Sequence, residues 1–261
     1  MNLSPIAVFD SGLGGLTVLR ALRDRLPNED YLYFADTRFL PYGDKPAAFL
    51  RERGVAIAQG LAERGAKAVV IACNTATAFA VEAIRAATSL PVVALEPGVK
   101  PAAALTRCGV IGVLATTRTL ASERYQRLVH RHAQAREVIA QACPGLADAI
   151  EQHGPDSAAV EALLDIYVQP LRAAGADVVV LGCTHYPWVA AGIGRRLPSG
   201  TQLLDTGAPV ARQLERLLAA KGLLGGRGGR LQMATSGAPH SVAETVDRLW
   251  GQHLPVEHWE P

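Results

Sequence analysis

Short apolar segments alternate along the chain with longer segments of helical periodicity, and this alternation constrains the fold more than any other feature. The apolar segments are residues 6–9, 31–34, 69–72, 91–95, 109–114, 178–181 and 202–204. They are continuous rather than alternating in polarity, which is typical of strands buried on both faces. Strand and helix in regular succession predict parallel strands joined by crossover helices. We therefore predict an α/β fold with mainly parallel sheets flanked by helices.

Helical periodicity fills the intervals between these strands. The predicted helices are residues 16–26, 46–64, 77–87, 119–132, 156–174, 209–220 and 240–250. Two further short strands are predicted at 138–140 and 230–234. The glycine-rich segment 222–229 is predicted to be a surface loop, and its composition leaves its conformation open.

Two segments of the chain resemble each other locally. Residues 64–76 read RGAKAVVIACNTA, and residues 174–186 read AGADVVVLGCTHY. This similarity predicts two like domains, the first formed by residues 1–95 and 206–261 and the second by residues 96–205. Ligands of open α/β sheets bind beyond the carboxyl ends of the strands, so we expect an active site in a cleft between the two domains.

Composition and charge exclude several classes of protein. The 261 residues carry a formal net charge of +2, which gives no reason to expect a nucleic-acid or membrane-surface partner. The four cysteines include no Cys-x-x-Cys pair, so neither a zinc knuckle nor a dithiol redox motif is predicted. The first residues have no basic start and no long apolar run, and no segment approaches a membrane span. We expect a cytoplasmic protein with reduced thiols.

Two of the four cysteines stand out by position. Cys73 and Cys183 each follow a core strand, where the next residues are expected to open a helix. A helix N-terminus stabilises a thiolate, which is the reactive form of cysteine. Cys108 and Cys143 lack such a setting and are interpreted as structural, because a lone cysteine is usually a small apolar side chain.

Polar residues near the other strand ends have both ordinary and functional interpretations. Asp10 and Ser11, in VFDSGLGG, suit a helix cap; alternatively, Asp10 faces the cleft and orients a thiol or accepts a proton from it. The glycines do not form a dinucleotide fingerprint, because Thr17 stands where the third glycine belongs. His185 lies two residues past Cys183, and it is interpreted as setting the protonation of that thiol rather than binding zinc. Threonine hydroxyls at several strand–helix junctions suit either helix capping or carboxylate binding.

Seven segments together resemble the cofactor-independent glutamate racemases of the aspartate/glutamate racemase family. They are AVFDSGLGGLTVL, YFADTRFLPYGDK, VVIACNTATA, LEPGVKPA, GVLATTRTLASERY, CPGLADAIE and VVVLGCTHYP, and they run from residue 7 to residue 187. Related aspartate and hydantoin racemases share the twin cysteines, but DSGLGG, PYG and LGCTHYP fit the glutamate enzymes better. Thr77 departs from the commoner serine.

The resemblance implies an assignment of roles. Cys73 and Cys183 are expected to be the two bases, Asp10 to support the first thiol, and Glu151 and His185 to support the second. The implied substrate contacts, which include Asp10 and His185, are otherwise Ser11, Tyr42, Gly43, Asn74, Thr75, Thr116, Thr119 and Thr184. It also implies a homodimer, no cofactor and no metal, Cys183 acting on L-glutamate and Cys73 on D-glutamate, and a product used in peptidoglycan synthesis.

The chemistry of inversion agrees with two thiols. A proton leaves one face of the α-carbon and another arrives on the opposite face, so two groups must flank it. One begins as thiolate and the other as thiol, although an ordinary thiol with a pKa near ~8.5 is mostly protonated at neutral pH. The alternatives are a racemase of a related amino acid such as aspartate, a non-catalytic carboxylate-binding protein, or an inhibitor of DNA gyrase.

Overall fold

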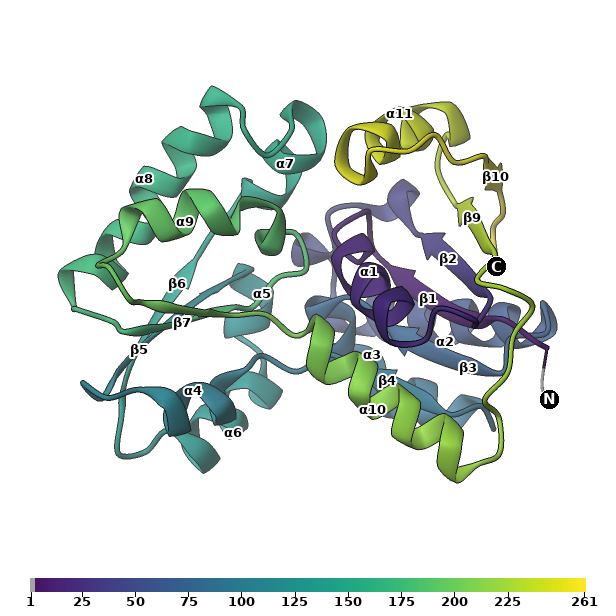
Figure 1. The fold of residues 1–261 in the computed structure, drawn as a ribbon, viewed down its shortest axis with the longest axis horizontal. Helices are drawn as coiled ribbons and strands as arrows, with labels where there is room; N and C mark the ends of the chain where they lie inside the picture. Colours follow the sequence, from purple (N-terminus) through teal and green to yellow (C-terminus); the bar gives the residue numbers. More distant parts are fainter. Residues whose placement is uncertain (1–2) are drawn as a thin grey trace. The chain divides into compact units, whose positions relative to one another are not determined.

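The computed structural model describes residues 3–261; Met1 and Asn2, where the predicted first domain starts, lie outside the described part. The predicted α/β class is confirmed, because all strand pairs among the described residues are parallel and helices flank both sheets (Figure 1). The chain divides into two compact units. The first comprises the residues up to Leu95 with Gly207–Pro261, and the second Glu96–Thr206. We propose that these units are the two domains.

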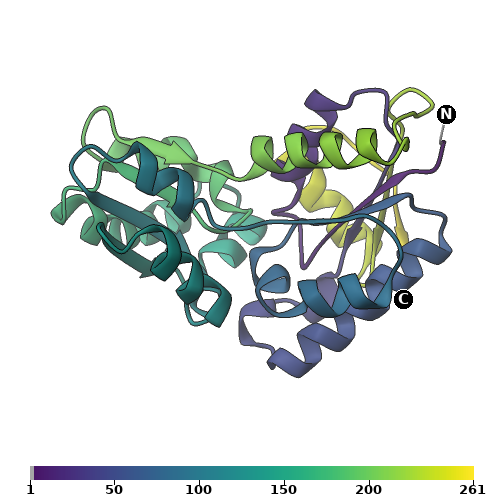
Figure 2. The same cartoon turned by 90° about the horizontal axis from the view of Figure 1, so that it is seen from below.

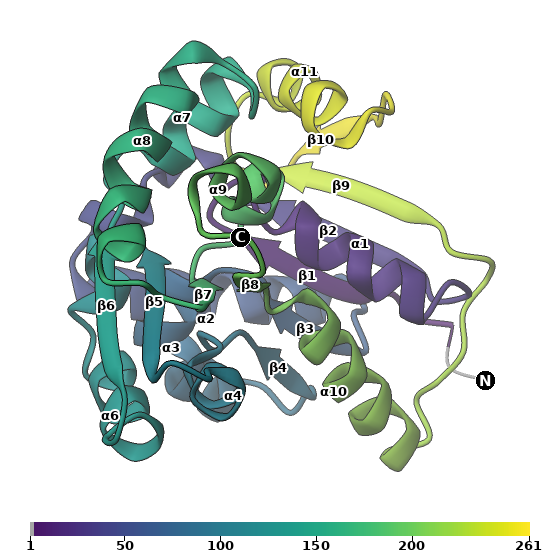
Figure 3. The ribbon, with the colours of Figure 1, turned by 60° about the vertical axis from the view of Figure 1, so that its left-hand side comes forward.

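The sheet of the first unit has the strand order β10-β9-β2-β1-β3-β4. Its strands are β1 (Ile6–Asp10), β2 (Tyr31–Ala35), β3 (Ala68–Ile71), β4 (Val92–Ala94), β9 (Leu231–Thr235) and β10 (Val256–His258). Figure 3 shows β9 beside β2, although about 200 residues of chain separate them, and Tyr31 pairs with Leu231 in that register. The last part of the chain therefore completes the first sheet.

Helices cover both faces of this sheet (Figure 2). They are α1 (Leu16–Arg25), α2 (Ala47–Glu63), α3 (Asn74–Ala87), α10 (Gly207–Ala220) and α11 (Pro239–Trp250). Phe9 and Phe34 pack against α2 and α3 in one apolar cluster. The alternate residues face α1, where the Tyr31 hydroxyl donates to the carbonyl of Leu22 at 3.0 Å. Burial on both faces explains why these strands read as unbroken apolar runs.

The sheet of the second unit has the order β6-β5-β7-β8, formed by β5 (Val110–Ala115), β6 (Glu137–Ala142), β7 (Val178–Leu181) and β8 (Gln202–Leu204). Its helices are α4 (Val99–Leu105), α5 (Thr117–Leu120), α6 (Glu123–His132), α7 (Leu146–His153), α8 (Ala158–Ala173) and α9 (Ala190–Arg196). The strands β2-β1-β3-β4 of the first unit follow one another in the same pattern, second-first-third-fourth. In each unit the third strand of this pattern leads to a cysteine.

Two predicted helices differ from the observed ones. Helix α3 begins at Asn74, three residues earlier than predicted, because Cys73 caps its N-terminus. The predicted helix 119–132 is two helices, since the Ser122 hydroxyl caps α6 by accepting from the Tyr125 amide at 3.1 Å. The elements α4, α7, α9 and β10 were not among the predicted helices and strands.

The glycine-rich segment 222–229 is held against the strand entry at residues 28–30. Lys67 and Glu29 form a buried ion pair at 2.5 Å, and the Gly225 amide donates to Glu29 Oε1 at 2.8 Å. A Cβ on Gly226 would lie 1.9 Å from the Asn28 carbonyl oxygen, so only glycine fits this approach.

Among the described residues no helix is long and apolar enough to cross a membrane.

Candidate active site

The predicted site residues fall into two groups, one in each unit. In the first unit, β1 and β3 are neighbours, with Phe9 opposite Ile71. Asp10 is the last residue of β1, and Cys73 lies two residues past the end of β3. The Ala72 amide donates to the Phe9 carbonyl at 2.7 Å and extends the pairing to the strand ends. Parallel pairing therefore brings Asp10, Ser11 and Cys73 to one edge of the sheet.

Ser11 links the carboxylate of Asp10 to the thiol of Cys73. The Ser11 hydroxyl lies 3.6 Å from Cys73 Sγ and 3.5 Å from Asp10 Oδ1. Asp10 is fully buried and accepts from the amides of Ser11 at 2.8 Å and Gly15 at 2.7 Å. The Asp10 carboxylate thus holds the loop before α1 without capping that helix, and it also accepts from the hydroxyl next to the thiol.

Cys73 occupies the N-cap position of α3. Its sulfur accepts from the Ala76 amide at 3.4 Å, and its side chain is 6% exposed. The unpaired amides and the dipole of a helix N-terminus favour a negative charge at this position. This is the setting that the sequence predicted, and it favours the thiolate form of cysteine.

Buried polar residues follow Cys73 in the first turn of α3. Asn74, Thr75 and Thr77 are each at most 5% exposed. Neither polar side-chain atom of Asn74 has a hydrogen-bond partner in the described part of the chain, and the hydroxyl of Thr77 lacks one as well. Buried polar groups are normally paired, so these groups fit a polar ligand such as a carboxylate or an ammonium group.

The turn predicted at Pro41–Gly43 forms a short 3-10 helix, Tyr42–Asp44. The Tyr42 side chain is buried in the cluster that contains Cys73, and its hydroxyl donates to Asp36 Oδ2 at 2.6 Å. Gly43 is partly exposed, and a Cβ there would meet nothing within 4 Å. The Tyr42 hydroxyl thus anchors this segment to Asp36.

In the second unit, Cys183 lies two residues past the end of β7, as Cys73 lies past β3. Gly182 makes this path possible, since a Cβ there would lie 2.8 Å from the Leu114 carbonyl oxygen. Thr116 follows the neighbouring strand β5 and caps α5. Its hydroxyl accepts from the Thr119 amide at 3.2 Å and donates to the Thr119 hydroxyl at 2.9 Å. Thr184 is buried beside Cys183 in the chain.

A hydrogen-bonded chain joins Cys183, His185 and Glu151. Cys183 Sγ lies 3.6 Å from His185 Nδ1, and His185 Nε2 lies 2.6 Å from Glu151 Oε1. Burial alone would lower the pKa of His185, but the hydrogen bonds and charges of Cys183 and Glu151 outweigh it and raise the pKa well above its ordinary value. The ring is therefore held as an imidazolium that can balance a thiolate.

The two cysteines differ in how a negative sulfur is stabilised. Cys183 leads into a 3-10 turn, Tyr186–Val189, rather than directly into an α-helix as predicted. The fold places His185 at the N-terminal side of that turn, where its ring reaches back to the sulfur. A counter-charge thus does for Cys183 what a helix N-terminus does for Cys73.

The remaining cysteines occupy different environments. Cys108 is exposed. Cys143 is buried, and burial raises the pKa of its thiol to about 12, which keeps it protonated. Cys143 and the fully buried Tyr186 both lie within electrostatic reach of Cys183, a proximity that the sequence interpretation missed. The sequence did carry a signal for this proximity, because Cys143 follows the strand β6 as Cys73 and Cys183 follow their strands.

Within residues 3–261 no cluster of three His, Cys, Asp or Glu side chains is arranged to hold a metal ion.

Comparison with known proteins gives a consistent result. The model of the family described as Asp/Glu/Hydantoin racemase matches residues 18–214. A glutamate racemase from Stutzerimonas stutzeri is 47% identical over 97% of both chains. Glutamate racemase from Thermus thermophilus, solved with β-chloro-D-alanine, is 37% identical with a TM-score of 0.83, covering 97% of this chain and 95% of that one. The Escherichia coli enzyme, solved with L-glutamate and the activator UDP-MurNAc-Ala, is 31% identical with a TM-score of 0.86, covering 98% and 97%.

Proposed function

The chain belongs to the Asp/Glu/hydantoin racemase family, and from that premise we propose that it interconverts L- and D-glutamate, with Cys73 and Cys183 as the two acid–base groups. The assignment of glutamate as the substrate rests on 47% identity to a glutamate racemase over nearly the full length of both chains. The twin cysteines, each two residues past a core strand, support the assignment of the bases. The reaction is an isomerisation, and its D-glutamate product serves peptidoglycan synthesis.

In the proposed reaction, one cysteine as thiolate takes the α-proton of glutamate, and the other as thiol donates a proton to the opposite face. The roles exchange with the handedness of the substrate. Charge develops at the α-carbon and on the adjoining carboxylate. Amide groups and buried hydroxyls, such as those of Asn74, Thr75 and Thr119, suit the stabilisation of that charge.

Each cysteine has a different helper in this scheme. Asp10 acts on Cys73 through Ser11, whose hydroxyl lies between carboxylate and thiol. His185, held by Glu151, supplies a positive charge to Cys183 and can pass a proton to it. The active state in this scheme needs one cysteine as thiolate and the other as thiol.

The experiment that tests the function is incubation with L-glutamate in deuterated water, with neither pyridoxal phosphate, metal nor nucleotide added. Optical rotation is expected to decay to zero while the α-proton signal disappears. The same experiment with L-aspartate tests the related amino acid. Loss of activity on adding a chelator, with recovery on adding zinc, would contradict the cofactor-free mechanism.

Thiol alkylation provides a prediction about the individual cysteines. Iodoacetamide is expected to inactivate the protein by labelling Cys73 or Cys183, and bound glutamate is expected to slow this reaction. Cys143 is expected to resist labelling because its thiol stays protonated, with a pKa of about 12. The exposed Cys108 is expected to react without loss of activity, so a Cys108→Ser variant is the matched control. Peptide mapping that placed the inactivating label on Cys108 or Cys143 would refute the assignment.

Further parts of the proposal concern assembly and location. We propose a homodimer that works in the cytoplasm and has no nucleic-acid or membrane partner, on the basis of the family and of a net charge of +2. Light scattering coupled to size-exclusion chromatography tests the dimer, and a monomer at micromolar concentration would oppose it.

A further inference from the structure

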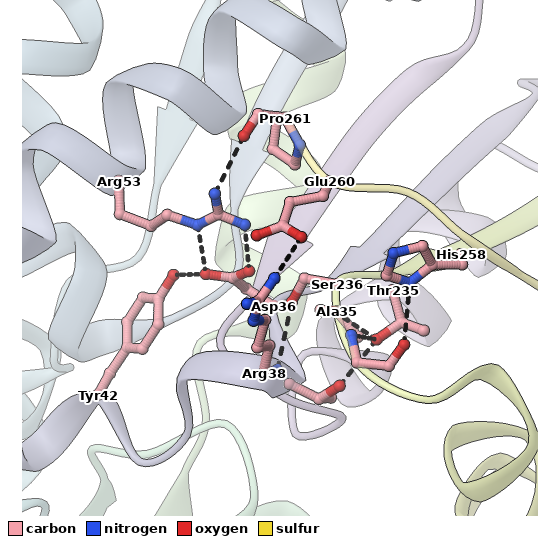
Figure 4. A network of polar contacts seen from close by, with 12 residues as sticks. Ala35, Asp36, Arg38, Tyr42, Arg53, Thr235, Ser236, His258, Glu260 and Pro261 are labelled. Carbon is pink, nitrogen blue, oxygen red and sulfur yellow. Dashed lines mark hydrogen bonds and ion pairs between the residues drawn. The ribbon is translucent and has the colours of Figure 1, made fainter.

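A buried ion pair lies next to the substrate segment of the first unit. Asp36 directly follows β2 and is fully buried, and the Arg53 side chain on α2 is 9% exposed. Arg53 donates from Nη2 to Asp36 Oδ1 at 2.7 Å and from Nε to Asp36 Oδ2 at 2.9 Å (Figure 4). Burying two charges costs desolvation energy, so such a pair is weak evidence for a purely stabilising role.

The third member of this network is Tyr42. Its hydroxyl donates to Asp36 Oδ2 at 2.6 Å, and the side chain is almost fully buried. Burial first, and then the Asp36 carboxylate, raise the pKa of Tyr42 well above its ordinary value. The hydroxyl therefore stays protonated and keeps donating to Asp36.

Tyr42 is also the fixed point of its segment. Of residues 40–45 it alone is buried, and the 3-10 turn starts at this residue. The neighbours Pro41 and Asp44 are exposed and Gly43 is partly exposed. The position of the Gly43 backbone thus depends on one anchored ring, and the anchor is the Asp36 carboxylate.

Further contacts hold the ion pair in place. The Asp36 amide donates to the Asp10 carbonyl at 3.0 Å, which connects it to the strand end beside Cys73. Arg53 donates from Nη1 to the Pro261 carbonyl at 3.1 Å, and its guanidinium lies 4.6 Å from the centroid of the Phe39 ring. These contacts leave the guanidinium little freedom, so it presents Asp36 to Tyr42 in one orientation.

We propose that Asp36 and Arg53 are positioning residues for substrate binding, acting through the Tyr42 hydroxyl on the backbone of residues 41–43. This inference rests on the proposed function, together with the contacts of Tyr42 and Gly43 to glutamate that the family resemblance implies. Asp36 and Arg53 themselves touch neither the substrate nor the thiols in this scheme. They set the affinity for glutamate and leave the proton transfers unchanged.

The test compares Tyr42→Phe, Asp36→Asn and the double variant. Each single change is expected to raise KM for both glutamate enantiomers by about fivefold to tenfold, the effect of losing one hydrogen bond of ordinary net strength, while kcat stays within about twofold. The double variant is expected to show no larger KM than the more affected single variant, since both changes break the same link. The equilibrium constant between enantiomers is one, so kcat/KM must fall equally in both directions.

Tyr31→Phe is the matched control. It removes a buried, bonded tyrosine hydroxyl in the same unit, one that donates to the carbonyls of Leu22 and Leu26 and has no link to residues 41–43. It is expected to lower the thermal midpoint and to leave KM unchanged.

Three results would overturn the inference. One is an active protein in which Tyr42→Phe and Asp36→Asn lower the midpoint as the control does and leave KM unaltered. Another is a pair of KM effects that multiply in the double variant. The third is a wild-type protein that does not racemise glutamate, which removes the proposed function as well. If Asp36→Asn fails to fold, the KM of Tyr42→Phe decides alone.

Discussion

Replacing either Cys73 or Cys183 by alanine is expected to abolish racemisation, with kcat falling by at least about 10³-fold, because one face of the α-carbon then loses its only base or acid. Removing the α-proton, however, requires only the thiol on the proper face. A single variant is therefore expected to retain any reaction that ends without reprotonation from the other side.

A glutamate analogue with a leaving group on its β-carbon provides such a reaction. The thiolate takes the α-proton, the electron pair forms a carbon–carbon double bond, and the leaving group departs with its own pair. Family resemblance assigns Cys183 to the L form and Cys73 to the D form. Cys73→Ala is thus expected to eliminate from the L analogue, and Cys183→Ala from the D analogue.

The outcome is measured as release of the leaving group from each enantiomer. Cys108→Ser is the control and is expected to behave as the wild type, since Cys108 is exposed and has no role in the scheme. If both alanine variants eliminated from the same enantiomer, or if folded, glutamate-binding variants eliminated from neither, the two-base scheme would be wrong for this protein.

Replacing His185 by asparagine is expected to lower kcat/KM for racemisation by about 10²-fold to 10³-fold, because Cys183 then loses its positive partner and proton source. The loss must be equal in both directions, since the two enantiomers have equal free energy. The half-reactions are expected to differ: elimination from the L analogue falls, and elimination from the D analogue, served by Cys73, persists. Equal loss from both analogues would argue that His185 has a general structural role.

The contact between His185 and Glu151 is expected to affect how the reaction rate depends on pH. Glu151 raises that pKa, so Glu151→Gln is expected to let His185 lose its proton at lower pH. The basic limb of the kcat/KM profile should then move to lower pH. Asp165→Asn removes a carboxylate of the same unit that pairs with Arg196, and it is expected to leave the profile in place. An unmoved limb in Glu151→Gln would exclude His185 as the titrating group.

The raised pKa of His185 also makes the stability of the fold depend on pH. A histidine whose pKa is raised by folding stabilises the folded state below the unfolded-state pKa. That contribution is lost as the pH rises through the higher folded-state value. Glu151→Gln should therefore reduce the free energy of unfolding at mildly acidic pH more than at alkaline pH.

Hydrophobic pattern alone determined the class of fold. Residues 69–71 and 178–181 are continuous apolar runs because both faces of their strands are buried, and such runs are typical of parallel sheets with helices on each side. The positions of Cys73 and Cys183 at strand ends were visible for the same reason, as was Asp10 at the end of β1. These features depend on local periodicity, which a sequence displays directly.

Contacts between distant segments were decided only by the tertiary structure. Glu151 lies on α7, and nothing in its local sequence shows that it meets His185 from beyond β7. Asp36 reads as one more polar residue after a strand, until α2 places Arg53 against it and the 3-10 turn brings Tyr42. Cys143 reads as a spare cysteine, although the order β6-β5-β7 brings it within electrostatic reach of Cys183. Packing over the whole sheet determines which strands become neighbours. The hydrogen-bond and ion-pair partners of these side chains are therefore fixed only by the complete fold.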